Sequence, residues 1–327
     1  MHVYAVVPVS QFEPESIITE SIEYLKELEC DNFTFEVYYV IETFPGDKRT
    51  LSRVLPDNFN IMLRTPRGRK AGALNDFLSV VKNADYVAVF DVDSRPAKDY
   101  VVKCIAALEE NDSAVVSTGC SFIYNANSVL TKIVSISNTL ACDAYNLQSG
   151  SEGFFPGGLA VVMKVSLLEG EKLNEESLVG DFDLMTRLYL KGKVSVFANT
   201  VAGDQAPITL KDLYHQRVRW QRGAAGSFSR YFIPMVKAPI PFTRKILWLS
   251  TIMLGFCLFL LSPYTISLFL ANRHDIRKLS DGPLDVVKIL LGGIGFAWFV
   301  TACGFVALAQ HITSSKSEWK PAVRSDV

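Results

Sequence analysis

The stretch YVAVFDVDSRP, residues 86–96, joins a short run of apolar and aromatic residues directly to two aspartates. Such a run is typical of a strand in a sheet that helices cover on both faces. Ligands of these sheets bind beyond the carboxyl ends of the strands, where Asp91 and Asp93 stand. If the backbone stays extended there, both carboxylates point to one side and suit a divalent cation, Mg²⁺ or Mn²⁺. Asp-x-Asp pairs also occur in turns and helix caps, so this stretch alone leaves both interpretations open.

Similar runs alternate with amphipathic segments on both sides of this stretch. The strand-like runs are residues 3–9, 35–41, 60–63, 114–118 and 194–197. The helix-like segments are residues 15–28, 71–81, 99–110, 125–150 and 210–226. Strands that alternate with helices predict an α/β fold with a mostly parallel, Rossmann-like sheet. We expect one domain over residues 1–230.

A basic segment precedes the aspartate pair. It reads RTPRGRKAGALND, residues 64–76, and carries Arg64, Arg67, Arg69 and Lys70 at the start of a predicted helix. Cationic side chains and free amides at a helix N-terminus together bind anions such as phosphate. A solvated basic turn is the competing explanation.

An acidic helix start follows at residues 180–192, which read GDFDLMTRLYLKG. Asp181 has two possible roles there. An Asp at this position is often the helix N-cap. It is also suited to act as a general base that removes a proton from an acceptor hydroxyl. The spacing does not decide between the two.

The segment HQRVRWQRG, residues 215–223, places Gln216, Arg219 and Trp220 at helical spacings of three and four. They would share one helix face, where an amide, a guanidinium and an indole suit a phosphorylated sugar. The alternative is a helix on a membrane surface, with its arginines facing lipid headgroups.

The C-terminal third is much more apolar than the rest of the chain. Residues 246–270 and 289–309 carry no charge, and each run is long enough to cross a bilayer as a helix. We predict membrane spans at 246–270 and 286–310, an interfacial segment at 231–245 and a cytosolic tail at 311–327. Two buried helices of a soluble domain are the alternative. Gly293 and Ala297 match a small-xxx-small pattern, which suits packing of membrane helices within one chain or between two copies.

Charge and cysteine content exclude several other classes. The formal net charge of −1, from 33 basic and 34 acidic residues, gives no general attraction for nucleic acid. Six scattered cysteines without a Cys-x-x-Cys pair argue against a disulfide framework and a zinc site. The N-terminus, MHVYAVVPVS, lacks the features of a secretory signal, so we expect the first two thirds of the chain to stay in the cytosol.

Four segments of this chain resemble the family 2 glycosyltransferases in their order and spacing. They are KAGALN, the Asp-x-Asp pair, the acidic helix start with its Arg-Leu, and QRVRW. The resemblance is strongest to the branch with a Gln-x-x-Arg-Trp motif, which includes cellulose, hyaluronan and chitin synthases and ceramide glucosyltransferase. It implies a GT-A nucleotide-diphospho-sugar transferase fold followed by C-terminal transmembrane helices. It also implies an inverting, metal-dependent hexosyltransferase that uses a UDP-sugar, or else a GDP-sugar, and a polysaccharide or lipid-linked acceptor.

The resemblance also implies roles for individual residues, which are taken here motif by motif. Lys70 matches the lysine near the diphosphate, Asp91 the aspartate that contacts the nucleotide, and Asp93 the metal ligand. Asp181 matches the catalytic base. Gln216 and Arg219 match the part of their motif that holds the diphosphate, and Trp220 the part at the acceptor end. The remaining matches are Pro8 and Glu42 on the donor side, and Gly157 and Gly158 in the acceptor pocket.

Two departures from the family pattern favour an alternative function. Ser10 follows Pro8 where an aromatic would stack on a base, and Gly180 stands where many members carry an acid. The alternative is a membrane-tethered nucleotide-sugar-binding or scaffold protein with impaired catalysis. Two membrane helices also cannot enclose a polymer channel unless chains assemble.

Overall fold

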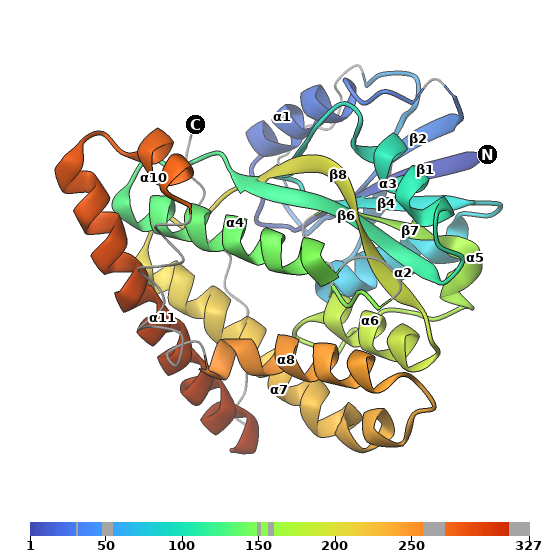
Figure 1. Ribbon diagram of the computed structural model, residues 1–327. Helices are drawn as coiled ribbons and strands as arrows, with labels where there is room; N and C mark the ends of the chain where they lie inside the picture. The colour runs from blue at the N-terminus through green and yellow to red at the C-terminus, as the bar shows by residue number, and fades with distance from the viewer. Residues whose placement is uncertain (31, 48–54, 149–151, 156–159, 258–271, 314–327) are drawn as a thin grey trace. The chain divides into compact units, whose positions relative to one another are not determined.

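The computed structural model describes residues 1–30, 32–47, 55–148, 152–155, 160–257 and 272–313 (Figure 1). The chain divides into two compact units. The first comprises Met1–Ser121 and Gln148–Asp204, and the second comprises Phe122–Leu147 and Gln205–Val327. Each unit is described by itself below.

The first unit is built on an eight-stranded sheet with the order β3-β2-β1-β4-β7-β6-β8-β5. Its strands are β1 (His2–Val9), β2 (Thr34–Glu42), β3 (Phe59–Arg64), β4 (Tyr86–Phe90), β5 (Arg95–Pro96), β6 (Ala114–Ile123), β7 (Ala160–Lys164) and β8 (Val194–Asp204). Every strand-like run identified in the sequence forms one of these strands, whereas β5 and β7 were not predicted.

The two halves of the sheet differ in strand direction. β1 pairs in parallel with β2 and β4, so that Ala5 lies beside both Val37 and Ala88, and β2 pairs in parallel with β3. β7 instead runs antiparallel to β4 and to β6, with Phe90 opposite Ala160. The α/β prediction is confirmed, and the parallel arrangement holds for β3-β2-β1-β4. β4 is buried along its whole length and delivers Asp91 at its carboxyl end.

The described residues of the first unit form the helices α1 (Glu15–Leu25), α2 (Arg69–Val80), α3 (Tyr100–Glu109), α5 (Val165–Leu168) and α6 (Gly180–Leu190). Helix α2 buries Leu74 and Phe77, which fixes it in the core of the unit. Tyr100 of α3 is fully buried, and its hydroxyl donates to the carbonyl of Ala160 at 2.8 Å. The first turns of α2 and α6 carry the polar side chains Lys70 and Asp181.

The second unit is helical. Its described part contains α4 (Val129–Gln148), α7 (Leu210–Lys237), α8 (Phe242–Cys257), α10 (Arg273–Leu279) and α11 (Pro283–Ile312). The helix predicted at residues 210–226 continues through Pro234 to Lys237, so it takes up part of the segment predicted as interfacial. Ile289 and Phe296 of α11 pack with Ile133 of α4 in one hydrophobic cluster. A side chain at Gly292 would overlap Ile133, which shows how closely the two helices approach.

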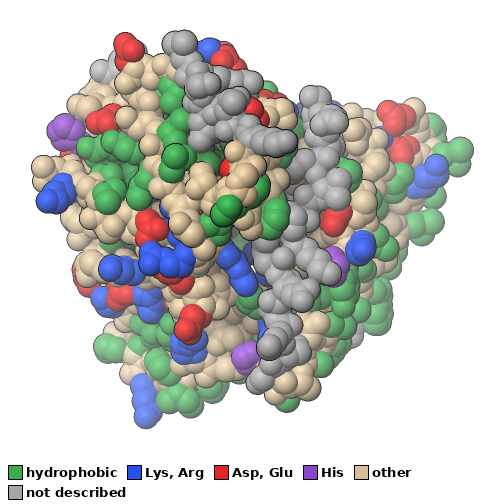
Figure 2. Space-filling model, turned by 180° about the vertical axis from the view of Figure 1, so that it is seen from behind, with side chains coloured by type: hydrophobic (Ala, Val, Ile, Leu, Met, Phe, Trp, Pro, Cys, Tyr) green, Lys and Arg blue, Asp and Glu red, His purple; other side chains and the backbone are tan. Residues whose placement is uncertain are grey.

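Helix α11 is long and apolar enough to cross a membrane, and among the residues described it alone meets both criteria. Of its most apolar stretch, 44% is buried within the chain. Large exposed hydrophobic side chains run along the helix, and five of them are spaced seven residues apart: Leu284, Leu291, Trp298, Phe305 and Ile312. Val287 and Leu308 are exposed as well. Exposed hydrophobic side chains are visible in several places on the face drawn in Figure 2. The other predicted span is described only as far as Cys257, because residues 258–271 lie outside the described part, and the two-span arrangement stays a prediction.

Candidate active site

The aspartate pair lies in a tight turn at the end of β4. The amide of Ser94 donates to the carbonyl of Asp91 at 2.8 Å, which closes the turn directly after the strand. The backbone therefore does not stay extended after β4, which was the condition for both carboxylates to point to one side. The Asp91 side chain is 36% exposed, while Asp93 is buried. The turn places a solvent-accessible carboxylate and a buried one next to each other in the chain.

Lys70 faces this turn from the first turn of α2. Its Nζ donates to Oδ1 of Asp91 at 2.5 Å, and its side chain is about one-third exposed, at 35%. Burial lowers the pKa of Lys70, but the carboxylates of Asp91, Asp181 and Asp93 outweigh it and raise that pKa above its ordinary value. The four predicted residues Lys70, Asp91, Asp93 and Asp181 thus interact in one place within the first unit.

Asp181 stands in the first turn of α6 and does not cap the helix. The N-cap position is occupied by Val179, whose side chain makes no capping bond. Oδ1 of Asp181 accepts a hydrogen bond from the amide of Phe182 at 2.8 Å. The alternative role as N-cap is therefore wrong. Asp183, by contrast, is buried and forms an ion pair with Arg187 at 3.0 Å.

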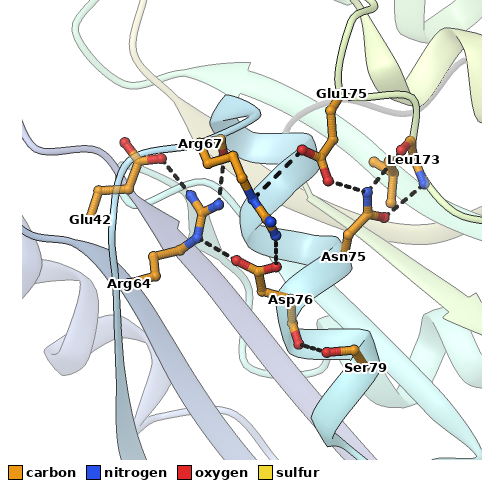
Figure 3. A network of polar contacts seen from close by, with 8 residues as sticks. All are labelled: Glu42, Arg64, Arg67, Asn75, Asp76, Ser79, Leu173 and Glu175. Atoms are coloured by element: carbon orange, nitrogen blue, oxygen red, sulfur yellow. Dashed lines mark hydrogen bonds and ion pairs between the residues drawn. The ribbon is translucent and has the colours of Figure 1, made fainter.

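Two arginines of the basic segment, Arg64 and Arg67, form ion pairs with acidic side chains. Arg64 is buried and donates from Nη1 to Glu42 at 2.6 Å and from Nε to Asp76 at 2.9 Å (Figure 3). Arg67 donates to Asp76 at 2.5 Å and lies 4.0 Å from the Glu175 carboxylate. The predicted phosphate-binding role is wrong for Arg64, because its buried guanidinium is paired with the carboxylates of Glu42 and Asp76. Glu42 is buried as well, and its contact with a nucleotide stays a prediction.

Two glycines explain why the basic segment folds as it does. Gly68 has a φ of 63°, a left-handed conformation that glycine adopts without strain, and it directly precedes α2. The amide of Gly72 donates to the carbonyl of Gly68 at 2.9 Å, and a Cβ at Gly72 would overlap the carbonyl oxygen of Arg67. That same oxygen accepts from Nη2 of Arg64 at 2.5 Å. The chain can therefore turn tightly onto the buried Arg64 and present Lys70 in the first turn of α2.

The second unit carries the predicted Gln216, Arg219 and Trp220 together on α7. The Trp220 side chain is 40% exposed, and the guanidinium of Arg217 lies over its ring at 4.6 Å. Arg217 also lies 5.5 Å from the ring of Phe296 on α11. Arg217 thus packs against two aromatic rings, which does not fit an arginine that faces lipid headgroups. The part that the motif plays in the site of the first unit stays a prediction.

Of the predicted residues Pro8, Gly157 and Gly158, the structure describes only Pro8. Pro8 lies near the end of β1 beside Val40 of β2, and Ser10 follows directly after the strand. Gly157 and Gly158 lie outside the described residues. Their predicted roles in donor and acceptor binding are therefore not tested here.

The donor set fits a magnesium-type ion that is shared with a substrate. Within the described part of the chain, no group of three or more His, Cys, Asp or Glu side chains could hold a metal. Asp91 and Asp93 provide two carboxylates, and Mg²⁺ in enzymes is often held by one or two carboxylates together with phosphate oxygens and water. The residues present therefore suit an ion that binds with a diphosphate.

Sequence reasoning missed the polar network around α2, which involves Asn75, Asp76 and Glu175 (Figure 3). Asn75 bonds to the backbone of Leu173, 98 positions further along the chain. Asn75 and Asp76 belong to the basic segment, but Glu175 lies in a stretch without periodicity. No signal in a single sequence indicates that such distant positions meet.

Comparison with known proteins gives consistent results at three levels. A family model described as glycosyl transferase family group 2 matches residues 86–310. The probable glucomannan 4-beta-mannosyltransferase 3 of Oryza sativa subsp. japonica is 32% identical over 191 residues, which cover 56% of this chain and 33% of that protein. Glucomannan 4-beta-mannosyltransferase 9 of Arabidopsis thaliana is 30% identical over 170 residues, covering 50% of this chain and 32% of that protein. The chain thus spans about a third of the length of these relatives.

Two solved structures share the fold. The mannosyltransferase PcManGT from Pyrobaculum calidifontis, in complex with GDP-Man and Mn²⁺, has a TM-score of 0.62 at 17% identity, covering 96% of this chain and 88% of that one. S. aureus TarS 1–349 in complex with UDP has a TM-score of 0.55 at 14% identity, covering 98% and 94%. At these identities the likeness concerns the fold alone.

Proposed function

Because this chain belongs to glycosyl transferase family group 2, we propose that it is an inverting glycosyltransferase that moves a hexose from a nucleoside diphosphate to an acceptor hydroxyl. The observation that carries the proposal is the meeting of Lys70 with Asp91, Asp93 and Asp181. A cation at the start of a helix suits a diphosphate, and a nearby carboxylate suits proton removal. The GT-A fold supplies the frame on which these groups are held.

In the proposed reaction the acceptor oxygen attacks the anomeric carbon while Asp181 takes its proton. The bond between the anomeric carbon and the diphosphate oxygen breaks, and the nucleoside diphosphate leaves with the electron pair. Lys70 stabilises the negative charge that grows on the departing diphosphate. Mg²⁺ or Mn²⁺ would be held by Asp91 and Asp93, and when bound it would neutralise the same charge. A single in-line displacement inverts the configuration at the sugar.

For the donor we propose GDP-mannose as the first candidate. Two relatives are named as glucomannan mannosyltransferases, and one structure with the same fold was obtained with GDP-Man. UDP-sugars, which the sequence analysis expected first, are the second candidate, since another structure with this fold contains UDP. For the acceptor we propose a glycan or a lipid-linked sugar.

We also propose that the enzyme is bound to a membrane with its catalytic residues in the cytosol. Helix α11 supports this because it is long enough to span a bilayer and exposes apolar side chains along its length. A second span over residues 246–270 completes the proposed anchor. Gly293 and Ala297 are buried within the chain, so we propose that their small-xxx-small spacing serves helix packing inside one chain and not contact between copies.

The function is tested by incubating the full chain, in membranes or detergent, with GDP-mannose and a panel of UDP-sugars. Release of nucleoside diphosphate and formation of a glycosylated product are measured with Mn²⁺, with Mg²⁺ and with EDTA. We expect turnover with one donor class, and loss of turnover with EDTA. Binding of a donor without transfer under any condition would instead support a nucleotide-sugar-binding protein without catalytic activity.

A further inference from the structure

Residues 171–177, here called the strap, lead directly toward α6 and its Asp181. The strap contains neither helix nor strand. Within it, the amide of Ser177 donates to the carbonyl of Asn174 at 3.1 Å, and the side chain of Leu173 is buried. A segment without repeating backbone bonds depends on side chains from its neighbours for its position.

Helix α2 holds one part of the strap through Asn75. Its Nδ2 donates to the carbonyl of Leu173 at 2.9 Å, and its Oδ1 accepts from the amide of Leu173, also at 2.9 Å. The same Nδ2 lies 3.1 Å from Oε1 of Glu175 (Figure 3). Asn75 therefore satisfies both backbone groups of Leu173, as the next strand of a sheet would.

Helix α6 holds the strap from the other side through Arg187. Nη2 of Arg187 donates to the carbonyl of Lys172 at 2.6 Å, and Nη1 forms an ion pair with Glu171. Nε of the same guanidinium bonds to the buried Asp183 at 3.0 Å, within α6 itself. One guanidinium thus ties the strap to the helix that carries Asp181.

From these contacts we propose that Asn75 is a positioning residue, which acts through the strap to hold Asp181 at a fixed place relative to Lys70. The inference rests on the proposed function, in which Lys70 binds the diphosphate and Asp181 takes the proton. Lys70 stands five positions before Asn75 on α2, and Asp181 follows the strap by four positions. The strap is a short, doubly bonded link between the helices that carry them.

Loss of Asn75 should displace the strap and not α2. The helix is held independently by the buried Leu74 and Phe77 and by the ion pair of Asp76 with Arg64. Donor binding at Lys70 is therefore preserved, while the base is less well placed. A misplacement of about 1 Å can lower a rate by roughly 100-fold.

The test compares the full wild-type chain with Asn75→Ala in the transfer assay. We expect kcat to fall by about 10- to 100-fold, with the donor KM and the Kd for the nucleoside diphosphate changed less than about twofold. Asn58→Ala is the matched control, because Nδ2 of Asn58 also bonds to a backbone carbonyl, that of Phe35 at 3.3 Å, away from the strap. That control should keep its kcat. An unchanged kcat in Asn75→Ala, or equal losses in both variants, would overturn the inference.

A second pair of variants tests the contact itself. Asn75→Asp places a carboxylate against Glu175 and removes the donor to Leu173, so it should also lower kcat. Adding Glu175→Gln removes the repulsion and restores a donor between the two side chains, so part of the lost kcat should return. No recovery in the double variant would contradict the role of this contact.

Hydrogen exchange gives a readout that does not need activity. Amides in residues 171–185 should exchange faster in Asn75→Ala than in the wild-type chain and in Asn58→Ala. If the wild-type chain shows no transfer, the proposed function fails while exchange still tests the strap. If transfer is present but exchange in this stretch is unchanged, the strap inference alone is wrong.

Discussion

Nζ of Lys70 on α2 lies 2.5 Å from Oδ1 of Asp91 at the end of β4. In the proposed function, this cation at the start of α2 binds the diphosphate of the donor. We predict that Lys70→Met weakens binding of the nucleoside diphosphate by tenfold or more, about 1.4 kcal/mol, because a charge-assisted contact is lost. Titration calorimetry measures it. Lys103→Met is the control: Lys103 on α3 also pairs with an aspartate, Asp99, and its loss should leave the affinity for the nucleoside diphosphate unchanged.

The raised pKa of Lys70 gives a prediction for pH. Its ordinary value is 10.5, and Asp91, Asp181 and Asp93 raise it despite the opposing effect of burial. A group whose pKa is raised in the folded state contributes fully to the free energy of unfolding below its unfolded pKa, and this contribution is lost as the pH rises through the folded pKa. Below these values Lys70 keeps its positive charge, which is the form that binds a diphosphate in the proposed function. Nucleoside diphosphate affinity should thus change less than about twofold between pH 7.5 and 9.5. A loss of affinity centred in this range, and absent from Lys70→Arg, would contradict it.

Asp181 and Asp183 both stand in the first turn of α6, but substitution by Asn should affect activity at Asp181 and stability at Asp183. Asp181→Asn should lower kcat by about 100- to 10,000-fold, the usual contribution of a general base, and leave donor affinity and Tm unchanged. Asp183→Asn should lower Tm, because Asp183 is buried and pairs with Arg187. Single-turnover kinetics and thermal unfolding separate the two effects. Undiminished turnover in Asp181→Asn would remove it from the role of base.

The buried ion pair of Arg64 and Glu42 should matter for stability more than for chemistry. Their side chains are 4% and 11% exposed. Arg64→Met removes the guanidinium that pairs with the buried Glu42 and with Asp76, and should cost about 3–5 kcal/mol. Arg67→Met should cost less than about 1 kcal/mol, because the Arg67 side chain is 65% exposed. Denaturant unfolding measures both, and the double variant Arg64→Met/Glu42→Gln should recover part of the loss. Equal costs for the two arginines would show that burial does not decide their contribution.

The sequence predicted the strands well because a strand depends on neighbouring residues. Runs of β-branched residues form strands wherever the sheet buries them, and β4 is an example along its whole length. The apolar run before Asp91 therefore located the carboxyl end of β4 correctly. The local turn after it escaped prediction, because a bond from Ser94 to Asp91 is as compatible with the residues as extended backbone.

What could not be predicted depends on partners that are distant in the chain. Arg64 resembles a surface arginine in the sequence, and only the carboxylates of Glu42 and Asp76 make its burial possible. Asn75 and Leu173 likewise become neighbours only when α2 packs beside the strap. The antiparallel pairing of β7 with β4 follows from tertiary packing in the same way. Periodicity carries no information about which distant segments will meet.

Helix α11 exposes an apolar stripe of side chains seven residues apart, namely Leu284, Leu291, Trp298, Phe305 and Ile312. A step of seven residues is close to two helical turns, so these side chains lie along one side. Ile289, Phe296 and Val300 of the same helix are buried in the second unit. At 30 residues the helix is about 45 Å long, more than the hydrocarbon thickness of a bilayer. We therefore predict that the stripe contacts lipid.

Brominated lipids test this contact, since they quench a tryptophan that touches their acyl chains. In vesicles the wild-type chain should be quenched, and Trp298→Phe should lose most of that quenching, because the side chain of Trp298 is 55% exposed on the stripe. Trp248→Phe is the control: Trp248 on α8 is 1% exposed and stacks on Phe228, so bromine cannot reach it. Its removal should leave the quenched signal in place. If quenching is the same in the wild-type chain and in Trp298→Phe, the stripe does not face lipid, and α11 must be covered by protein instead.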